Sequence, residues 1–253
     1  MLQQEAAIFF AALRFFTRLP VPRWVGHSEE QLNHAARWFP AVGWIVGASG
    51  AAVTLAALLV WPAPVAVLLG MVATLLVTGA FHEDGLADTI DGLGGGWTRE
   101  DALSIMKDSR IGSYGAIGIG IALLLKFLAL GEHAVLPAPT FALVLVAGHA
   151  VSRFASTTLI CFLDYARAEG KAKPLATRMG GGELAFAALG GLAPCLFLPW
   201  AQVAGALGLT ALVTLLAARS FVKRLGGYTG DCLGATQQLA EIAFYLGLLC
   251  ACS

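Results

Sequence analysis

Long apolar runs separated by short polar connections dominate this sequence. No Asp, Glu, Lys, Arg or His occurs between Trp38 and Phe81, and a second uncharged run extends from Leu184 to Ala218. A helix needs about 20 apolar residues to cross the hydrocarbon core of a bilayer. Each run is long enough for two such helices, and prolines divide both runs at positions where a continuous helix is disfavoured.

The pattern predicts an all-α, polytopic membrane bundle of about seven spanning helices. We expect these helices near residues 38–61, 63–80, 111–131, 137–163, 184–198, 200–218 and 233–252. The amphipathic segment 2–17 leaves the count open by one, because such a segment can lie in the interface without crossing the bilayer. The whole chain, 1–253, is expected to form a single integral membrane domain.

The basic residues test this arrangement, because Lys and Arg gather in the cytoplasmic loops of membrane proteins. Apart from two intramembrane positions, they lie before the first predicted helix and after the second, fourth and sixth. The other three connections contain neither Lys nor Arg. This alternation predicts a cytoplasmic N-terminus and three cytoplasmic polar loops, at 81–110, 164–183 and 219–232.

Composition agrees with a membrane protein. Of 253 residues, 58% are hydrophobic and 13% charged, whereas soluble domains carry roughly 25% charged residues. The mean hydropathy is +0.76. These values exclude an ordinary cytosolic enzyme, a disordered protein and a basic nucleic-acid-binding protein. The five cysteines form no Cys-x-x-Cys pair, so we interpret them as small apolar residues rather than zinc ligands or disulfides.

An acidic cluster follows the second predicted helix. Asp84, Asp88 and Asp91 are spaced i, i+4 and i+7, which places them on one helical face. Three carboxylates on one face repel each other, and a divalent cation would relieve that repulsion. Hard carboxylate oxygens without Cys or paired His suit Mg²⁺ or Mn²⁺. The alternative is an acidic turn that is merely solvated.

Basic residues follow the acidic cluster closely. The glycine-rich stretch 92–96 is expected to end the acidic helix, and Thr98 with Asp101 predicts a capping box for a second short helix. That helix returns Lys107 and Arg110 toward the membrane. Acidic metal ligands beside Lys and Arg are the composition that a phosphate or pyrophosphate ligand requires. No Gly-Lys-Ser/Thr is present, so a Walker loop is excluded.

Lys126, Arg153 and Glu241 fall inside predicted membrane helices. Such residues usually face the bundle interior or a water-filled cavity, although long basic side chains also reach the interface. For Arg153 the two environments are equally expected, whereas Lys126 is expected to extend to the interface. Glu241 is a candidate partner for a basic residue.

The final polar loop contains Gly226, Gly227 and Gly230 around Thr229 and Asp231. Glycine lets a backbone approach a ligand closely, with Thr229 and Asp231 as polar contacts. A plain membrane turn explains the same residues equally well.

Five stretches together resemble the cobalamin synthase family, the adenosylcobinamide-GDP ribazoletransferases. They are RFFTRLPVP at 14–22, FHEDGLADTIDG at 81–92, MKDSRIGSYG at 106–115, YARAEG at 165–170 and GGYTGDCLGA at 226–235. The stretches are spread over most of the chain, and the 81–92 and 226–235 blocks are the most specific of them.

The resemblance implies a multi-pass enzyme of a prokaryotic inner membrane with its active site facing the cytoplasm. Such an enzyme transfers the adenosylcobinamide-phosphate group from adenosylcobinamide-GDP to α-ribazole or α-ribazole 5′-phosphate and releases GMP. This reaction belongs to the last steps of adenosylcobalamin biosynthesis. The resemblance implies Mg²⁺ as cofactor, the two substrates and the lipid bilayer as partners, and no nucleic acid.

The chemistry can be placed on residues as a hypothesis that follows from the resemblance. Asp84, Asp88 and Asp91 would hold Mg²⁺ on the pyrophosphate, and either Asp91 or His82 would take the proton of the attacking ribose hydroxyl. His82 is equally well explained as a helix-end residue at the interface. The residues expected to bind substrate are Lys107, Arg110, Arg153, Arg167, Thr229 and Asp231, with Asp231 also able to complete the metal site.

Two rival functions come from different classes. A CDP-alcohol phosphotransferase also uses an Asp-rich motif at the mouth of a helical bundle, but its Ala-Arg pair is missing here, since Asp88 follows Ala87. A transporter would place its ionisable residues at the bilayer midplane, whereas most charge here lies in the polar loops. The oligomeric state stays open, because Gly43-x-x-x-Gly47 can pack helices within one chain or between chains.

Overall fold

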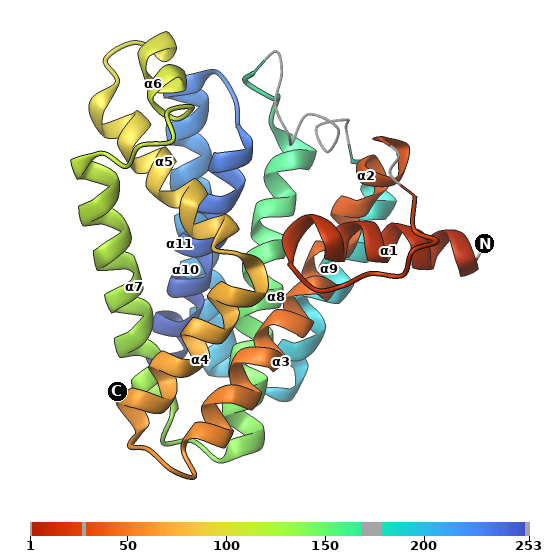
Figure 1. Ribbon diagram of the computed structural model, residues 1–253, viewed down its shortest axis with the longest axis vertical. Helices are drawn as coiled ribbons and strands as arrows, with labels where there is room; N and C mark the ends of the chain where they lie inside the picture. Colours follow the sequence, from red (N-terminus) through yellow and green to blue (C-terminus); the bar gives the residue numbers. More distant parts are fainter. Residues whose placement is uncertain (1, 27–28, 168–178, 251–253) are drawn as a thin grey trace.

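The computed structural model describes residues 2–26, 29–167 and 179–250, and this part of the chain is a helical bundle without β-strands (Figure 1). Its α-helices are α1 (Leu2–Phe16), α2 (Glu29–Ala35), α3 (Phe39–Ala57), α4 (Ala63–Thr78), α5 (Phe81–Gly95), α6 (Arg99–Ile105), α7 (Ser113–His133), α8 (Ala138–Phe162), α9 (Gly181–Leu192), α10 (Trp200–Leu225) and α11 (Gly230–Cys250). Short 3₁₀ segments, η1 (Ala36–Trp38) and η3 (Ala193–Phe197), precede α3 and follow α9. The predicted all-α class is confirmed.

Proline and glycine define most helix ends, as the sequence predicts. Pro62 and Pro199 immediately precede α4 and α10, and the predicted capping box of Thr98 and Asp101 opens α6. The acidic helix α5 is longer than expected, since it continues to Gly95. Gly92 remains within α5. Its lack of a side chain lets α6 pack closely, because a Cβ at Gly92 would overlap the side chain of Met106.

A sharp bend separates the apolar helix α4 from the acidic helix α5. Gly79 and Ala80 both adopt positive φ angles, of 67° and 57°, and the two helix axes differ by 88°. α4 is about 24 Å long at 1.5 Å per residue, which is shorter than a hydrocarbon core of about 30 Å. The bend directs α5, and therefore Asp84, Asp88 and Asp91, toward the polar end of the bundle.

Within the described ranges, four helical segments are individually long and apolar enough to cross a membrane. They are Gln31–Ala57, Ser113–His133, Ala138–Phe162 and Trp200–Leu225, and the bent pair α4–α5 passes the same test only when it is counted as one broken segment. Because α5 carries the acidic cluster, we treat it as part of the polar end. The seven-helix count and the side of the N-terminus stay predictions.

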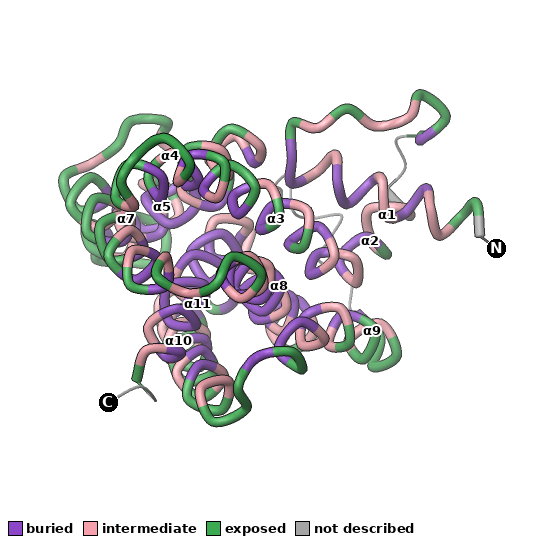
Figure 2. The backbone as a smooth tube through the Cα atoms, turned by 90° about the horizontal axis from the view of Figure 1, so that it is seen from below, coloured by how far each residue is buried: buried purple, intermediate pink, exposed green. Residues whose placement is uncertain are grey.

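The centre of the bundle is formed by α8 and α11, whose residues are the most completely buried (Figure 2). α3 packs against α8, and α10 and α5 pack against α11. The close approach of α3 and α8 depends on Gly43 and Gly47, where a Cβ would overlap the α8 backbone at His149 and Leu145. The Gly43-x-x-x-Gly47 motif therefore packs helices within one chain. The amphipathic segment at the N-terminus forms α1, which lies across the other helices (Figure 1).

Candidate functional site

The three polar loops meet at one end of the bundle. Backbone hydrogen bonds join Ala166 N to Tyr228 O (2.8 Å) and Tyr228 N to Asp164 O (2.9 Å). The Arg99 side chain donates to Leu225 O at 2.7 Å and to Ala166 O at 2.8 Å. The described residues of loops 81–110, 164–183 and 219–232 thus lie at the same end of the bundle. This agrees with the prediction that the three loops are on one side of the membrane. Residues 168–178, with Lys171, Lys173 and Arg178, lie outside the described part.

An acidic cluster with one arginine lies where these loops meet. Asp84 and Asp88 come from α5, whereas Asp231 comes from the first turn of α11. Arg167 pairs with Asp231, with its Nη2 2.9 Å from Oδ2. Partial burial, and then the charges of Asp84 and Asp231, raise the pKa of Asp88 to about 7, while Arg167 opposes this shift. These groups therefore interact electrostatically although they are far apart in sequence.

Asp231 belongs to this cluster, although the helical spacing of Asp84, Asp88 and Asp91 could not predict that. Burial raises the pKa of its carboxyl group, although Arg167 and Thr229 both favour the ionised form. The Thr229 hydroxyl accepts a hydrogen bond from Cys232 N at 3.3 Å. This is the geometry of a helix N-cap, so Thr229 begins α11 and thereby fixes Asp231 beside α5. The predicted role of Thr229 as a substrate contact stays untested.

Asp91 shares a helical face with Asp84 and Asp88 but has different partners. One of its carboxylate oxygens accepts a hydrogen bond from Gly112 N at 2.7 Å, and the other accepts one from Gly115 N at 2.8 Å. The carboxylate is buried and satisfies two backbone donors at the start of α7, where helices leave N–H groups unpaired. Asp91 therefore anchors α7 to α5, and its predicted roles as metal ligand and base stay untested.

Replacing Gly115 with alanine tests this anchor. A Cβ at Gly115 would overlap the Asp91 carboxylate and reach 2.8 Å from Ala87 O, so we expect a destabilisation of about 1–3 kcal/mol, measured by thermal unfolding in detergent. Gly120→Ala is the matched control on the same helix, because its Cβ would meet no atom within 4 Å. Equal melting temperatures for the two variants would contradict the anchoring role.

The predicted phosphate-binding residues Lys107 and Arg110 lie on the surface beside this anchor. Arg110 is paired with Asp108, with its Nη2 2.6 Å from Oδ2, and its side chain is 87% exposed. The Arg110 guanidinium lowers the pKa of Asp108 to about 2. Arg110 precedes Gly112 by two residues, and Gly112 donates to Asp91, so Arg110 lies beside the acidic helix while its own ion pair is with Asp108.

His82 and Arg153 lie deeper in the bundle and are both buried. The His82 ring stacks on Phe16, with 5.3 Å between centroids and 14° between planes. Burial at 3% exposure excludes His82 from an interfacial position. Arg153 donates to His149 O at 3.0 Å, and its Nε has no hydrogen-bond partner among the described residues. Arg153 thus faces the polar interior, one of its two expected environments.

A buried ion network extends below this position. Glu241 lies 3.2 Å from Lys126 Nζ and 3.3 Å from His149 Nδ1, and it accepts a hydrogen bond from Gln237 at 2.7 Å. Lys126 also donates to Gln238 at 2.6 Å. The expectation that Lys126 extends to the interface is wrong, because an internal carboxylate offers it a stronger partner than the distant headgroups. Glu241 is confirmed as the partner of a basic residue.

Polar contacts connect this network to the acidic helix. Gln238 donates to Glu83 at 2.8 Å, and Glu83 immediately precedes Asp84. Sequence reasoning did not single out Glu83, Gln237 or Gln238. For Gln237 and Gln238 the signal was the presence of uncharged amides inside an apolar span, where polar side chains usually face protein partners.

Within the described ranges, no three Asp, Glu, His or Cys side chains are close enough to surround a metal ion by themselves. Mg²⁺ commonly uses only one or two carboxylates together with substrate phosphates and water. The oxygen donors of Asp84, Asp88 and Asp231, and the mutual repulsion that raises the pKa of Asp88, fit such a partly open site.

Comparisons with known proteins agree with this arrangement. A family model described as cobalamin-5-phosphate synthase matches residues 8–249. Proteins named adenosylcobinamide-GDP ribazoletransferase from Ralstonia nicotianae and Ralstonia pickettii are each 50% identical to this chain, over 95% and 98% of its length and 94% and 97% of theirs. The protein of that name from Shewanella frigidimarina is 48% identical over 97% of this chain and 95% of its own. No solved structure matches.

Proposed function

The chain belongs to the cobalamin-5-phosphate synthase family, and we propose that it is a Mg²⁺-dependent adenosylcobinamide-GDP ribazoletransferase of the inner membrane. A ribose hydroxyl of α-ribazole, or of its 5′-phosphate, forms a bond to the phosphorus attached to cobinamide. The bond between that phosphorus and the GMP oxygen breaks, a base takes the hydroxyl proton, and GMP leaves. The reaction belongs to the last steps of adenosylcobalamin biosynthesis.

The observation that carries this proposal is the cluster of Asp84, Asp88 and Asp231 with Arg167. Carboxylates from two helices that are distant in sequence lie together at the loop end, and one arginine is already paired with them. Arg167 keeps donors for a ligand, because its Nε has no hydrogen-bond partner in the described part of the chain. A pyrophosphate needs this combination of cation ligands and guanidinium.

The carboxylates fit Mg²⁺ by their chemistry. Two of the carboxylates of Asp84, Asp88 and Asp231 would hold the ion together with substrate phosphate oxygens and water, with Asp231 taking the place expected for Asp91. When bound, Mg²⁺ would neutralise charge that develops on the phosphate oxygens as GMP leaves. Arg167 would orient the same oxygens from the side of Asp231.

The remaining expected residues have supporting places around this cluster. Arg110 and Lys107 flank the acidic helix at the surface, where their charge attracts and steadies the anionic GDP end of the donor substrate. Of the two proposed proton acceptors we retain His82, because both oxygens of Asp91 already accept backbone hydrogen bonds. His82 and Arg153 line the same small cavity, which Gly230, the neighbour of Asp231, also lines.

We place the active site on the cytoplasmic side. Arg99, Lys107, Arg110, Arg167, Lys223 and Arg224 belong to the loops that meet at this end. The connections at the other end contain no Lys or Arg, and cytoplasmic loops carry the excess of basic residues. The exposed apolar side chains of α7 and α10 suit contact with lipid acyl chains.

The direct test is GMP release by the purified protein in liposomes. Adenosylcobinamide-GDP with α-ribazole and Mg²⁺ should yield GMP and a cobalamin, and omission of Mg²⁺ should prevent it. CDP-diacylglycerol with an alcohol acceptor tests the rival phosphotransferase and should yield no CMP. Release of CMP but not GMP would overturn the proposal. Equal GMP release in the presence of a chelator would overturn the Mg²⁺ requirement.

A further inference from the structure

The acidic helix α5 and the last helix α11 touch directly at one pair of buried glycines. A Cβ at Gly85 of α5 would lie 3.1 Å from Asp231 Cα and 3.3 Å from Gly234 Cα. A Cβ at Gly234 of α11 would lie 3.2 Å from His82 Cα. Carbon atoms in contact are normally about 3.5–4.0 Å apart, so no side chain fits between the two backbones at this crossing.

This crossing lies inside the acidic cluster. Gly85 follows Asp84 directly and precedes Asp88 by three residues. The atoms that a Cβ at Gly85 would meet first belong to the Asp231 backbone, with Asp231 O at 2.9 Å. The backbone of Asp231 therefore rests against α5 at a point between Asp84 and Asp88. How closely Gly85 lets the two helices approach decides how far the Asp231 carboxylate lies from the carboxylates of α5.

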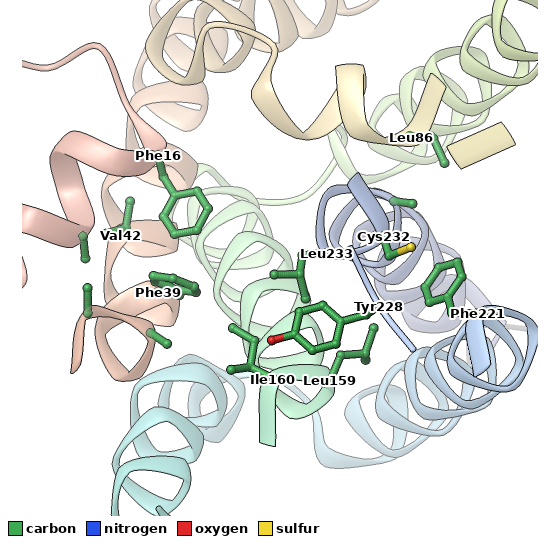
Figure 3. Close-up of a cluster of buried hydrophobic side chains, with 14 of the residues drawn as sticks. Phe16, Phe39, Val42, Leu86, Leu159, Ile160, Phe221, Tyr228, Cys232 and Leu233 are labelled. Carbon is green, nitrogen blue, oxygen red and sulfur yellow. The ribbon is translucent and has the colours of Figure 1, made fainter. Parts of the chain in front are cut away.

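Further contacts hold the two helices at this distance. One turn further along α11, Gln238 donates to Glu83 of α5 at 2.8 Å. Ser156 of α8 donates to Leu233 O of α11 at 2.7 Å, so α11 is also tied to the centre of the bundle. Leu86 and Leu233 are the sequence neighbours of the two glycines, and both belong to one cluster of buried side chains (Figure 3). Because packed interiors deform little, α11 has little freedom to move away from α5.

Asp231 keeps one carboxylate oxygen for a ligand. Its Oδ2 lies 2.9 Å from Arg167 Nη2 and 3.4 Å from the Thr229 hydroxyl. Both side-chain contacts that Asp231 makes with the described residues use this oxygen, which leaves Oδ1 for a cation. Carboxylates that bind a metal ion are commonly oriented by hydrogen bonds of this kind.

We propose that the contact between Gly85 and Gly234 is a positioning element of the site. It sets the separation at which Asp231 and a carboxylate of α5 together bind one small divalent cation, an inference that rests on the function proposed above. Mg²⁺ requires oxygen ligands at about 2.0–2.1 Å in nearly ideal octahedral geometry, whereas Ca²⁺ accepts about 2.3–2.6 Å in flexible geometry. A short separation fixed by two touching backbones therefore favours the smaller ion.

The experiment measures cation binding by the full-length protein in nanodiscs without substrate. Electron paramagnetic resonance reports bound Mn²⁺, and its displacement by Mg²⁺ or Ca²⁺ gives the two affinities. The methyl group added in Gly85→Ala moves the helices apart by about 0.5 Å. We expect Mg²⁺ to bind about 10- to 100-fold more weakly, the range found when a group that orients a metal ligand is changed. Ca²⁺ should lose less affinity, so the preference for Mg²⁺ over Ca²⁺ should fall at least about fivefold.

Gly95→Ala is the matched control on the same helix. Within 4 Å, a Cβ there would meet only the end of the Ile105 side chain, at 3.4 Å, so both affinities should equal those of the wild type. Gly234→Ala changes the other half of the contact and should shift the preference in the same direction. Its closest new contact is 3.1 Å, compared with 2.9 Å for Gly85→Ala, so its effect should be smaller.

A rescue separates positioning from a general loss of stability. Asp231→Glu lengthens the ligand side chain by one methylene group. Combined with either alanine variant, it should restore part of the Mg²⁺ affinity, although it cannot restore the packing of the helices. If Gly85→Ala does not fold, the milder Gly234→Ala decides the outcome.

An unchanged preference for Mg²⁺ in the folded alanine variants, or no gain from the longer side chain at position 231, would overturn the inference. Wild-type protein that releases GMP but binds no divalent cation would also overturn it. Wild-type protein that binds Mg²⁺ with the expected preference but releases no GMP would instead contradict the proposed function.

Discussion

Replacing Asp88 with asparagine is expected to reduce GMP release at least about a hundred-fold, the scale on which loss of one preorganised electrostatic group affects catalysis. Burial, and then the negative charges of Asp84 and Asp231, raise the pKa of the Asp88 carboxyl group, so Asp88 interacts with both of these carboxylates. Asparagine keeps the shape of the side chain but removes the charge that a cation needs. The measurement is GMP release in liposomes across a range of Mg²⁺ concentrations.

Two further measurements separate loss of chemistry from loss of structure. Asp88→Asn removes a repelling charge, so the melting temperature without divalent cations should stay equal to that of the wild type or rise. Glu100→Gln changes an acidic side chain that is 78% exposed on α6 and should leave GMP release unchanged. Wild-type rates in Asp88→Asn at limiting Mg²⁺ would remove Asp88 from the proposed site.

Replacing Glu241 with glutamine is expected to destabilise the fold by about 3–5 kcal/mol, the usual cost of breaking a buried ion pair from one side. Glu241 is the carboxylate that Lys126 and His149 both contact, and Tyr245 donates to it at 3.3 Å. Without its charge, Lys126 would remain buried beside an uncharged amide. Thermal unfolding in detergent and the yield of folded protein would report the loss.

A double variant tests the pairing itself. Lys126→Met combined with Glu241→Gln removes both charges, so part of the lost stability should return, and the difference measures the coupling between the two residues. Glu132→Gln, at an exposed position on α7, is the control and should have little effect. Additive losses in the double variant would show that Lys126 and Glu241 contribute independently.

The buried network also bears on the transporter considered from sequence. Ionisable residues at the midplane are typical of transport pathways, and Lys126, His149, Arg153 and Glu241 are all buried inside the helical bundle. Here Glu241 pairs with Lys126 and His149, and Gln238 connects Lys126 to Glu83 on the acidic helix. These contacts join α7, α8 and α11 to α5, so the network holds the acidic helix in place.

The sequence by itself determined the class of protein and which polar loops share one end of the bundle. Apolar runs predicted helices, Pro62 and Pro199 predicted where two of them begin, and the alternation of basic residues predicted which loops share a side. These properties depend on local composition and period, so a single chain is enough to read them. The motifs that resemble one family identified the substrates, and the comparisons agree with that identification.

Only the tertiary structure decided which carboxylates belong together. Helical spacing grouped Asp91 with Asp84 and Asp88, yet Asp91 binds the start of α7, and Asp231 from a distant helix lies beside the other two. Spacing along one helix cannot tell which neighbouring element each side chain meets. The same reason explains Lys126, whose partner Glu241 is 115 positions away in the numbering. Contacts between elements distant in sequence depend on packing, and packing exists only in the folded chain.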